Sequence, residues 1–171
     1  MKRNALDFRG LVFVVITGLI LSSCSKKSTP ADDLVGTWTE QSSTADAKVG
    51  TKPLLQYFTE DLGLTATEAQ QAQALFNFSI QQDFAGTIQI KSDHTYTSTL
   101  GGQSDAGTWN LSSDNKQLII DSNTENPFVL DVAKLTSSMM ELKGTATISQ
   151  DLNNDQIPET IIVSVDLNFT K

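Results

Sequence analysis

The chain has 171 residues, with 12 Lys and Arg against 20 Asp and Glu, and its formal net charge is −8 at neutral pH. This length allows one domain with a substantial hydrophobic core. The acidic balance argues against binding to nucleic acid or anionic lipid headgroups, because phosphate contacts need clustered Lys and Arg. The single cysteine leaves no pair for an internal disulfide.

Residues 1–23 predict a cleaved secretory signal peptide. Three basic residues precede an eleven-residue apolar run at 11–21, and a membrane-spanning helix would need about 20 residues. The following Leu21-Ser22-Ser23-Cys24 resembles the bacterial lipobox, which implies that Cys24 becomes the lipid-carrying first residue of the mature protein. We therefore expect membrane attachment through acyl chains on Cys24, to which each buried CH₂ contributes about 0.8 kcal/mol.

Residues 24–33 predict a flexible tether behind this anchor, because after the cysteine they contain no apolar residue larger than Ala or Pro. Removal of residues 1–23, which carry a net charge of +2, leaves −10 on the remaining chain. Ser25 stands where lipoproteins of the inner membrane commonly have Asp. Resemblance to that sorting rule implies delivery to the outer membrane in a diderm host, and leaves open whether the domain faces the periplasm or the cell surface.

The domain, residues 34–171, begins with an alternation of Leu34, Gly36 and Trp38 that predicts a strand, followed by a polar loop at 42–52. Residues 53–62 predict a short helix and residues 65–83 a longer one with a capping box at Thr65 and Glu68. These helices form an insert at about 44–83 between the first two strands. The insert could act as a lid over the open end of a barrel or as a structural cover.

After Phe84 the apolar period changes from 3.6 to 2, and short turns separate seven alternating segments. Together with the first strand they predict a mostly β fold, an eight-stranded antiparallel meander barrel. Its interior could be filled by side chains or hold one small ligand. The alternative is an open sheet or sandwich with the helices packed on one face.

Two copies of a short motif, Gly36-Thr37-Trp38 and Gly107-Thr108-Trp109, resemble the G-x-W signature of lipocalins. With the segment 93–96, Asp-His-Thr-Tyr, they resemble the lipocalin-like lipoproteins of Bacteroidetes over residues 34–169, apart from the helical insert. The resemblance implies a barrel with a binding or structural role, in which the first Trp plugs the closed end. The family's Arg over that Trp is absent, because the chain has no Arg after residue 9, so we expect that packing to be missing.

Five aromatic residues are candidates for contact with a ligand in the barrel. The two Trp could line a pocket or simply fill the closed end and core, which we favour. The Tyr could lie at a pocket mouth or act as a cross-strand partner. The candidates are Trp38, Tyr96 and Trp109 on predicted strands, and Phe76 and Phe78 on the longer helix.

Asp151, Asn153, Asp155 and Glu159 resemble the start of a calcium loop in their oxygen spacing. The pattern lacks the turn glycine and the closing bidentate Glu, so the alternative is a polar hairpin loop. Calcium at this loop is the one cofactor that the sequence suggests, and we expect no other. His94, the one histidine, has no sequence partners for a triad or zinc site and is expected to be a solvated turn residue.

The sequence favours a membrane-anchored, lipocalin-like protein that binds a small apolar or amphipathic molecule in the cell envelope. The alternative is a structural or protein-interaction module with a solid barrel core, with unknown protein partners. We expect no enzyme activity, because there is no Gly-rich phosphate loop after a strand and no G-x-S-x-G elbow, and the cysteine is assigned to the lipid.

Overall fold

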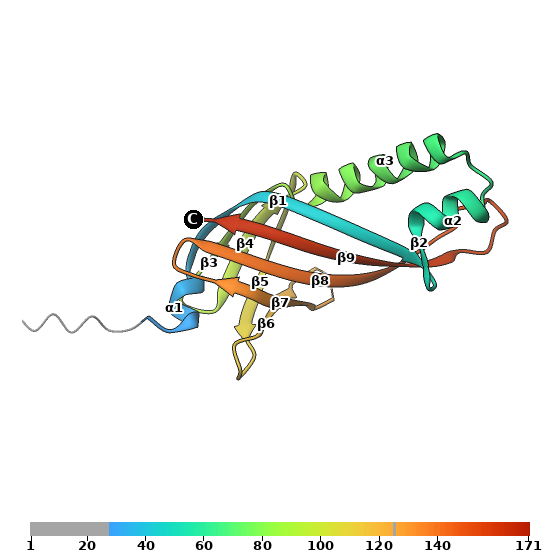
Figure 1. Cartoon of the computed structure of the whole chain (residues 1–171). Helices are drawn as coiled ribbons and strands as arrows, with labels where there is room; N and C mark the ends of the chain where they lie inside the picture. The colour runs from blue at the N-terminus through green and yellow to red at the C-terminus, as the bar shows by residue number, and fades with distance from the viewer. Residues whose placement is uncertain (1–27, 125) are drawn as a thin grey trace, which may run out of the picture.

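A computed structural model describes residues 28–124 and 126–171 (Figure 1). The predicted signal peptide and Cys24 therefore lie outside the described residues. The elements in chain order are α1 Pro30–Leu34, β1 Gly36–Val49, β2 Lys52–Pro53, α2 Leu54–Glu60, α3 Ala66–Phe84, β3 Gly86–Ile90, β4 Thr95–Leu100, β5 Gln103–Leu111, β6 Gln117–Ser122, β7 Phe128–Leu135, β8 Met139–Gln150 and β9 Glu159–Thr170.

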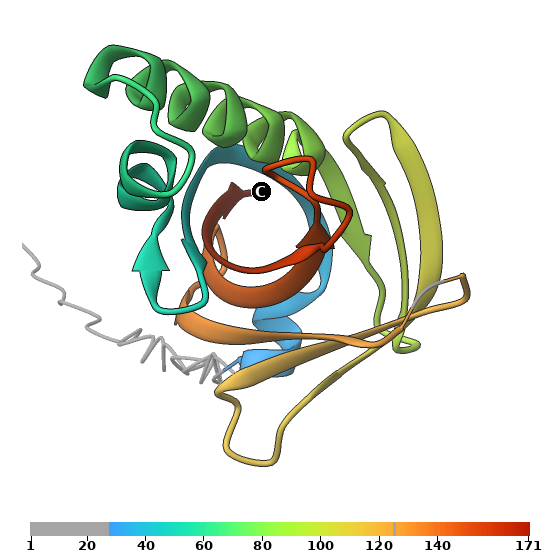
Figure 2. The same ribbon diagram turned by 90° about the vertical axis from the view of Figure 1, so that its right-hand side faces the viewer.

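Eight of the strands close into an antiparallel meander barrel, which confirms the predicted fold. β3 to β8 each pair with the next strand along the chain, β1 pairs with β3, and β1 also pairs with β9 to close the ring. The two-residue β2 is an extra strand beside the far end of β1. Figure 2 shows the strands curling around a common interior with α3 alongside. The open-sheet alternative is therefore wrong.

The first strand is much longer than its sequence pattern predicted. β1 continues to Val49 through the segment that we expected to be a polar loop, and pairs with β9 over that length. A bulge between Glu40 and Ser42 shifts the alternation by one residue, so that Ser43 and Ala47 lie on the buried face. Small and polar inward residues carry no apolar signal, and for this reason the pattern was missed. The helical insert thus begins at Leu54 rather than near residue 44.

β1, β8 and β9 extend beyond the shorter strands, and α2 and α3 lie along this extension (Figure 1). α3 begins as predicted, because the Thr65 hydroxyl accepts a hydrogen bond from the Glu68 amide at 3.3 Å and the Glu68 carboxylate accepts one from the Thr65 amide at 2.9 Å. Ala69 of α3 is fully buried, as is Leu54 of α2. No helix among the described residues is long and apolar enough to span a membrane.

Part of the predicted tether is helical. α1 starts at Pro30 and is capped by a reciprocal pair of hydrogen bonds between Thr29 and Asp32. Its last residue, Leu34, is fully buried, and the Leu34 carbonyl accepts a hydrogen bond of 2.7 Å from the Trp38 indole. The short helix therefore packs under one end of the barrel.

Candidate ligand-binding cavity in the barrel

The barrel contains a cavity of about 360 Å³ that is partly open to solvent. Ligand pockets range from about 300 to 1,000 Å³, so this volume suits a small molecule. Three small inward side chains, Ser98, Ser122 and Ala146, help to leave the space unfilled. The lining comes from β3 to β9, the end of α3 and the β6–β7 loop, and consists of Phe84, Ile88, Tyr96, Ser98, Leu100, Asp105, Ile120, Ser122, Asn126, Phe128, Leu130, Leu142, Ala146, Leu167 and Phe169.

A cluster of polar side chains interrupts the apolar lining around Asp105. The Tyr96 hydroxyl donates a hydrogen bond to Asp105 Oδ2, and the Ser122 hydroxyl donates one of 2.9 Å to Asp105 Oδ1. Ser98 lies directly opposite Asp105 in the β4–β5 pair. The bond from Tyr96, followed by that from Ser122, holds the pKa of Asp105 below its usual value. Among the described lining residues, Asp105 therefore supplies one carboxylate that stays ionised at neutral pH.

Trp38 lies at the closed end and not in the cavity lining. It is fully buried, and the ammonium of Lys171 stands 4.6 Å from the centre of its ring. The same ammonium donates a hydrogen bond of 2.6 Å to the Asp33 carbonyl. From the sequence we expected the family's Arg over this Trp to be missing, and the chain has no Arg there. We did not foresee that a lysine makes a cation–π contact in its place.

Trp109 also fills the barrel rather than lining the cavity. Its indole donates a hydrogen bond of 2.9 Å to the Lys91 carbonyl, and the exposed ring of His94 stacks on it with centroids 4.8 Å apart. The favoured interpretation of both Trp as core residues agrees with these positions.

The two Phe candidates on α3 do not reach the cavity either. Phe76 packs against the core, whereas the side chain of Phe78 is 59% exposed. Of the α3 residues, Phe84 alone is part of the described cavity lining. The insert therefore covers the barrel extension more than it covers the cavity.

Of the five candidates, Tyr96 alone lines the cavity, and sequence reasoning missed Asp105 and Ser122. A signal for Asp105 was present, since it precedes Gly107 and Trp109 in the same inward phase of β5. A charged residue at an inward strand position is uncommon and points to a functional or paired group.

Three of the four calcium candidates lie in the loop between β8 and β9 and bind the loop's own backbone, whereas Glu159 is the first residue of β9. Asp151, Asn153 and Asp155 accept hydrogen bonds of 2.8–2.9 Å from amides two to five residues further on. Among the described residues, no group of three His, Cys, Asp or Glu side chains is placed to hold a metal ion. The geometry is that of a polar loop with Asx-type turns.

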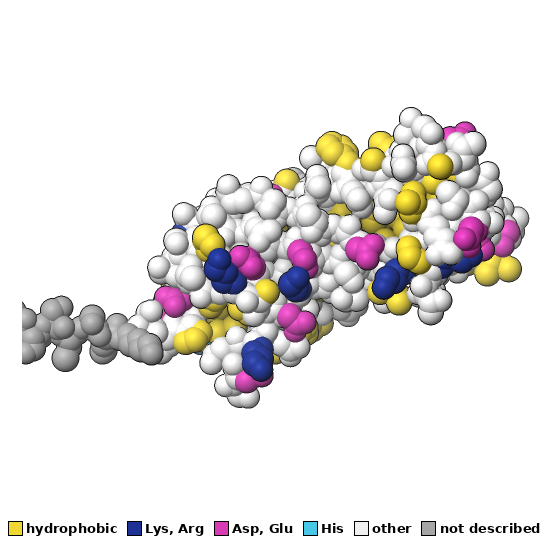
Figure 3. All heavy atoms as spheres, in the orientation of Figure 1, with side chains coloured by type: hydrophobic (Ala, Val, Ile, Leu, Met, Phe, Trp, Pro, Cys, Tyr) yellow, Lys and Arg dark blue, Asp and Glu magenta, His cyan; other side chains and the backbone are white. Residues whose placement is uncertain are grey.

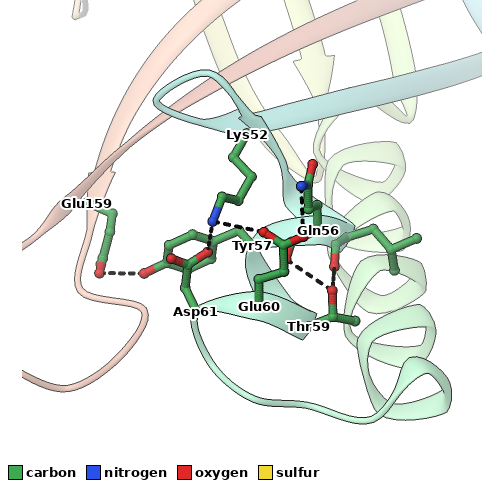
Figure 4. A network of polar contacts seen from close by, with 8 residues as sticks. Lys52, Gln56, Tyr57, Thr59, Glu60, Asp61 and Glu159 are labelled. Atoms are coloured by element: carbon green, nitrogen blue, oxygen red, sulfur yellow. Dashed lines mark hydrogen bonds and ion pairs between the residues drawn. The ribbon is translucent and has the colours of Figure 1, made fainter.

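Glu159 instead connects this loop to α2 (Figure 4). Its carboxylate accepts a hydrogen bond of 2.7 Å from the Tyr57 hydroxyl and another of 2.7 Å from the Leu152 amide. The bond to Glu159, with burial as a smaller cause, raises the pKa of Tyr57 to about 12. Lys52 pairs with Glu60 and Asp61 at the ends of α2. These contacts fix the helix against the far end of the barrel extension.

The chain matches no family model and no curated protein. A solved structure that it resembles is a DUF4847 family protein from Bacteroides vulgatus, with 15% sequence identity and a TM-score of 0.34. The match covers 75% of this chain and 90% of the other. Likeness at this level carries no argument about function, which must come from the cavity itself.

Proposed function

We propose that the protein is a lipocalin-like binding protein that holds one small, largely apolar molecule inside its barrel. The observation that carries this proposal is the cavity of about 360 Å³. Its lining is predominantly apolar, so affinity would come from burial of ligand surface at about 25 cal/mol per Å². A solid barrel, which the structural alternative requires, would not leave such a space.

The cellular location is part of the same proposal. Acylation of Cys24 would anchor the chain in the cell envelope, most simply in the outer membrane, and the short segment before Pro30 would hold the barrel near the bilayer. We also propose a non-catalytic role. Within the described lining, Asp105 is the one carboxylate and there is no histidine to serve as a base.

Native mass spectrometry of the full protein purified from its own cells tests this function. We expect an additional small mass on the wild-type protein. Ser98→Phe should abolish it, because the ring would occupy the cavity, whereas the matched variant Thr97→Phe should retain it, because Thr97 is exposed on the outer face of the same strand. A bound mass that survives Ser98→Phe, or its absence from wild-type protein that also fails to bind the neutral dye N-phenyl-1-naphthylamine, would contradict the proposal.

A second candidate, a protein-interaction module, is favoured by one observation outside the barrel. Leu75 and Phe78 on α3 are 70% and 59% exposed, and apolar side chains are visible over this helix in Figure 3. Exposed large apolar groups close together mark interaction surfaces. If the protein is an interaction module, the double variant Leu75→Ser, Phe78→Ser should no longer co-purify with its partner complex. The same variant should still bind the cavity ligand, because neither residue lines the cavity.

A further inference from the structure

We propose that the cavity selects amphiphiles with a positively charged amine head over matched alcohols and acids, a preference imposed by the Asp105 carboxylate inside the barrel. This inference rests on the proposed binding function and specifies the chemical class of the ligand.

The first argument is that Asp105 has neutral partners. Its oxygens accept hydrogen bonds from the hydroxyls of Tyr96, Ser122 and, at 3.4 Å, Thr124. Hydroxyl donors favour the ionised carboxylate but do not cancel its charge. A formal negative charge therefore remains at the edge of an apolar cavity.

The second argument is that the described structure supplies no cation to balance this charge. The cavity lining includes no Lys and no Arg. The ion pairs that the described residues form involve Lys52, Lys134 and Lys143, and none of them reaches Asp105. A partly desolvated carboxylate without a counter-charge attracts a cation more strongly than it would in water. An ammonium group on the ligand would be that cation.

The third argument is that negative charge on the protein repels acidic ligands and attracts cationic ones. A ligand carboxylate would lie beside a like charge and be repelled, so fatty acids are disfavoured. The net charge of −8 on the whole chain would raise the local concentration of cations and steer them toward the barrel. At about 360 Å³ the cavity has room for one ring system or one short chain behind the amine.

The test uses three indoles that share a ring and differ in the head group: tryptamine, tryptophol and indole-3-propionate. Isothermal titration calorimetry on the full chain should show tryptamine binding at least about tenfold tighter than tryptophol, as a charge-assisted hydrogen bond allows. Indole-3-propionate should bind most weakly. Asp105→Asn should bring tryptamine and tryptophol within about threefold of each other. The control Asp121→Asn removes an exposed carboxylate from β6 and should leave the preference intact.

Equal or tighter binding of tryptophol or indole-3-propionate by the wild-type protein would overturn this inference and leave the proposed function standing. The same conclusion follows if the preference survives Asp105→Asn, or if none of the three binds while N-phenyl-1-naphthylamine does. Failure of all four probes would count against the binding function as well. Should Asp105→Asn fail to fold, Ser98→Lys places a cation opposite Asp105 that would neutralise the carboxylate, and it is expected to abolish the preference for tryptamine over tryptophol.

Discussion

Trp38 shows how single residues determine the closed end of this barrel. The indole nitrogen is satisfied by the Leu34 carbonyl, and the ring face is covered by the ammonium of Lys171. Gly36 makes room for that lysine, because a Cβ there would lie 2.7 Å from Lys171 Cε. One aromatic ring thus ties the first strand to the last residue of the chain.

Replacing Lys171 with Met should lower stability, because Met keeps the apolar stem and loses both the cation–π contact with Trp38 and the hydrogen bond to the Asp33 carbonyl. At a solvent-accessible site the loss is about 0.5–1 kcal/mol in the free energy of unfolding, or a fall in Tm of about 1–4 °C, measurable by circular dichroism. Lys116→Met, at an exposed lysine of the β5–β6 turn, is the matched control and should change Tm less. An equal effect of both variants would rule out a specific role for the Trp38 contact.

Among the elements, the helical insert differs from the barrel in how it is held. α2 is attached by buried apolar residues and by the Tyr57–Glu159 hydrogen bond, which joins it to the first residue of β9. Sequence reasoning identified both helices from their caps and periodicity. It named Glu159 as a calcium candidate with a polar loop as the alternative, because nothing in the local sequence shows that a residue 102 positions away donates a hydrogen bond to it.

The Tyr57–Glu159 contact predicts a pH effect in the alkaline range. The folded pKa of Tyr57, about 12, lies above its ordinary value of 10. The folded state therefore holds the proton more tightly, and the contact's contribution to stability is complete below pH 10 and lost as the pH rises toward 12. Absorbance titration of the phenolate should show that Glu159→Gln lowers the pKa of Tyr57 toward 10. Glu60→Gln, on the same helix but without contact to the Tyr57 hydroxyl, should lower it much less.

At the scale of the whole molecule, strand pairing is uneven around the barrel. β9 pairs with β1 and β8 along most of its length, whereas β6 pairs over four or five positions with each neighbour. Most of the strand residues that line the cavity belong to the shorter strands β3 to β7, where fewer pairing contacts are available, and β8 and β9 supply the rest. A ligand in the cavity would add contacts to the less strongly paired side.

Hydrogen exchange measured by mass spectrometry should reflect this asymmetry. Amides of β9 are expected to exchange most slowly and those of β6 faster, because local opening is easier where pairing is short. Saturation with a cavity ligand should slow exchange in β4 to β6 more than in β9. Faster exchange in β9 than in β6 would show that the long β8–β9–β1 ladder does not form the stable part of the fold.

The two-residue alternation from Ile88 to Phe169 was sufficient to predict the number of strands, their antiparallel order and the shared interior. The capping box at Thr65 likewise predicted where α3 begins. These features are local, since each depends on residues a few positions apart. Where β1 departs from the rule, with a bulge and the small inward residues Ser43 and Ala47, the local signal disappeared and the prediction was wrong.

The sequence by itself determined the barrel class, the helices and the expectation of an export signal with a lipid anchor. Only the tertiary structure decided that the interior is hollow, that Asp105 lies among Tyr96 and Ser122, and that Lys171 covers Trp38. The physical reason is that the cavity is the space that side chains from seven strands do not fill. That volume depends on how the strands are staggered relative to one another. Periodicity shows which face of a strand points inward, but not which inward residues of different strands lie at the same level along the barrel axis.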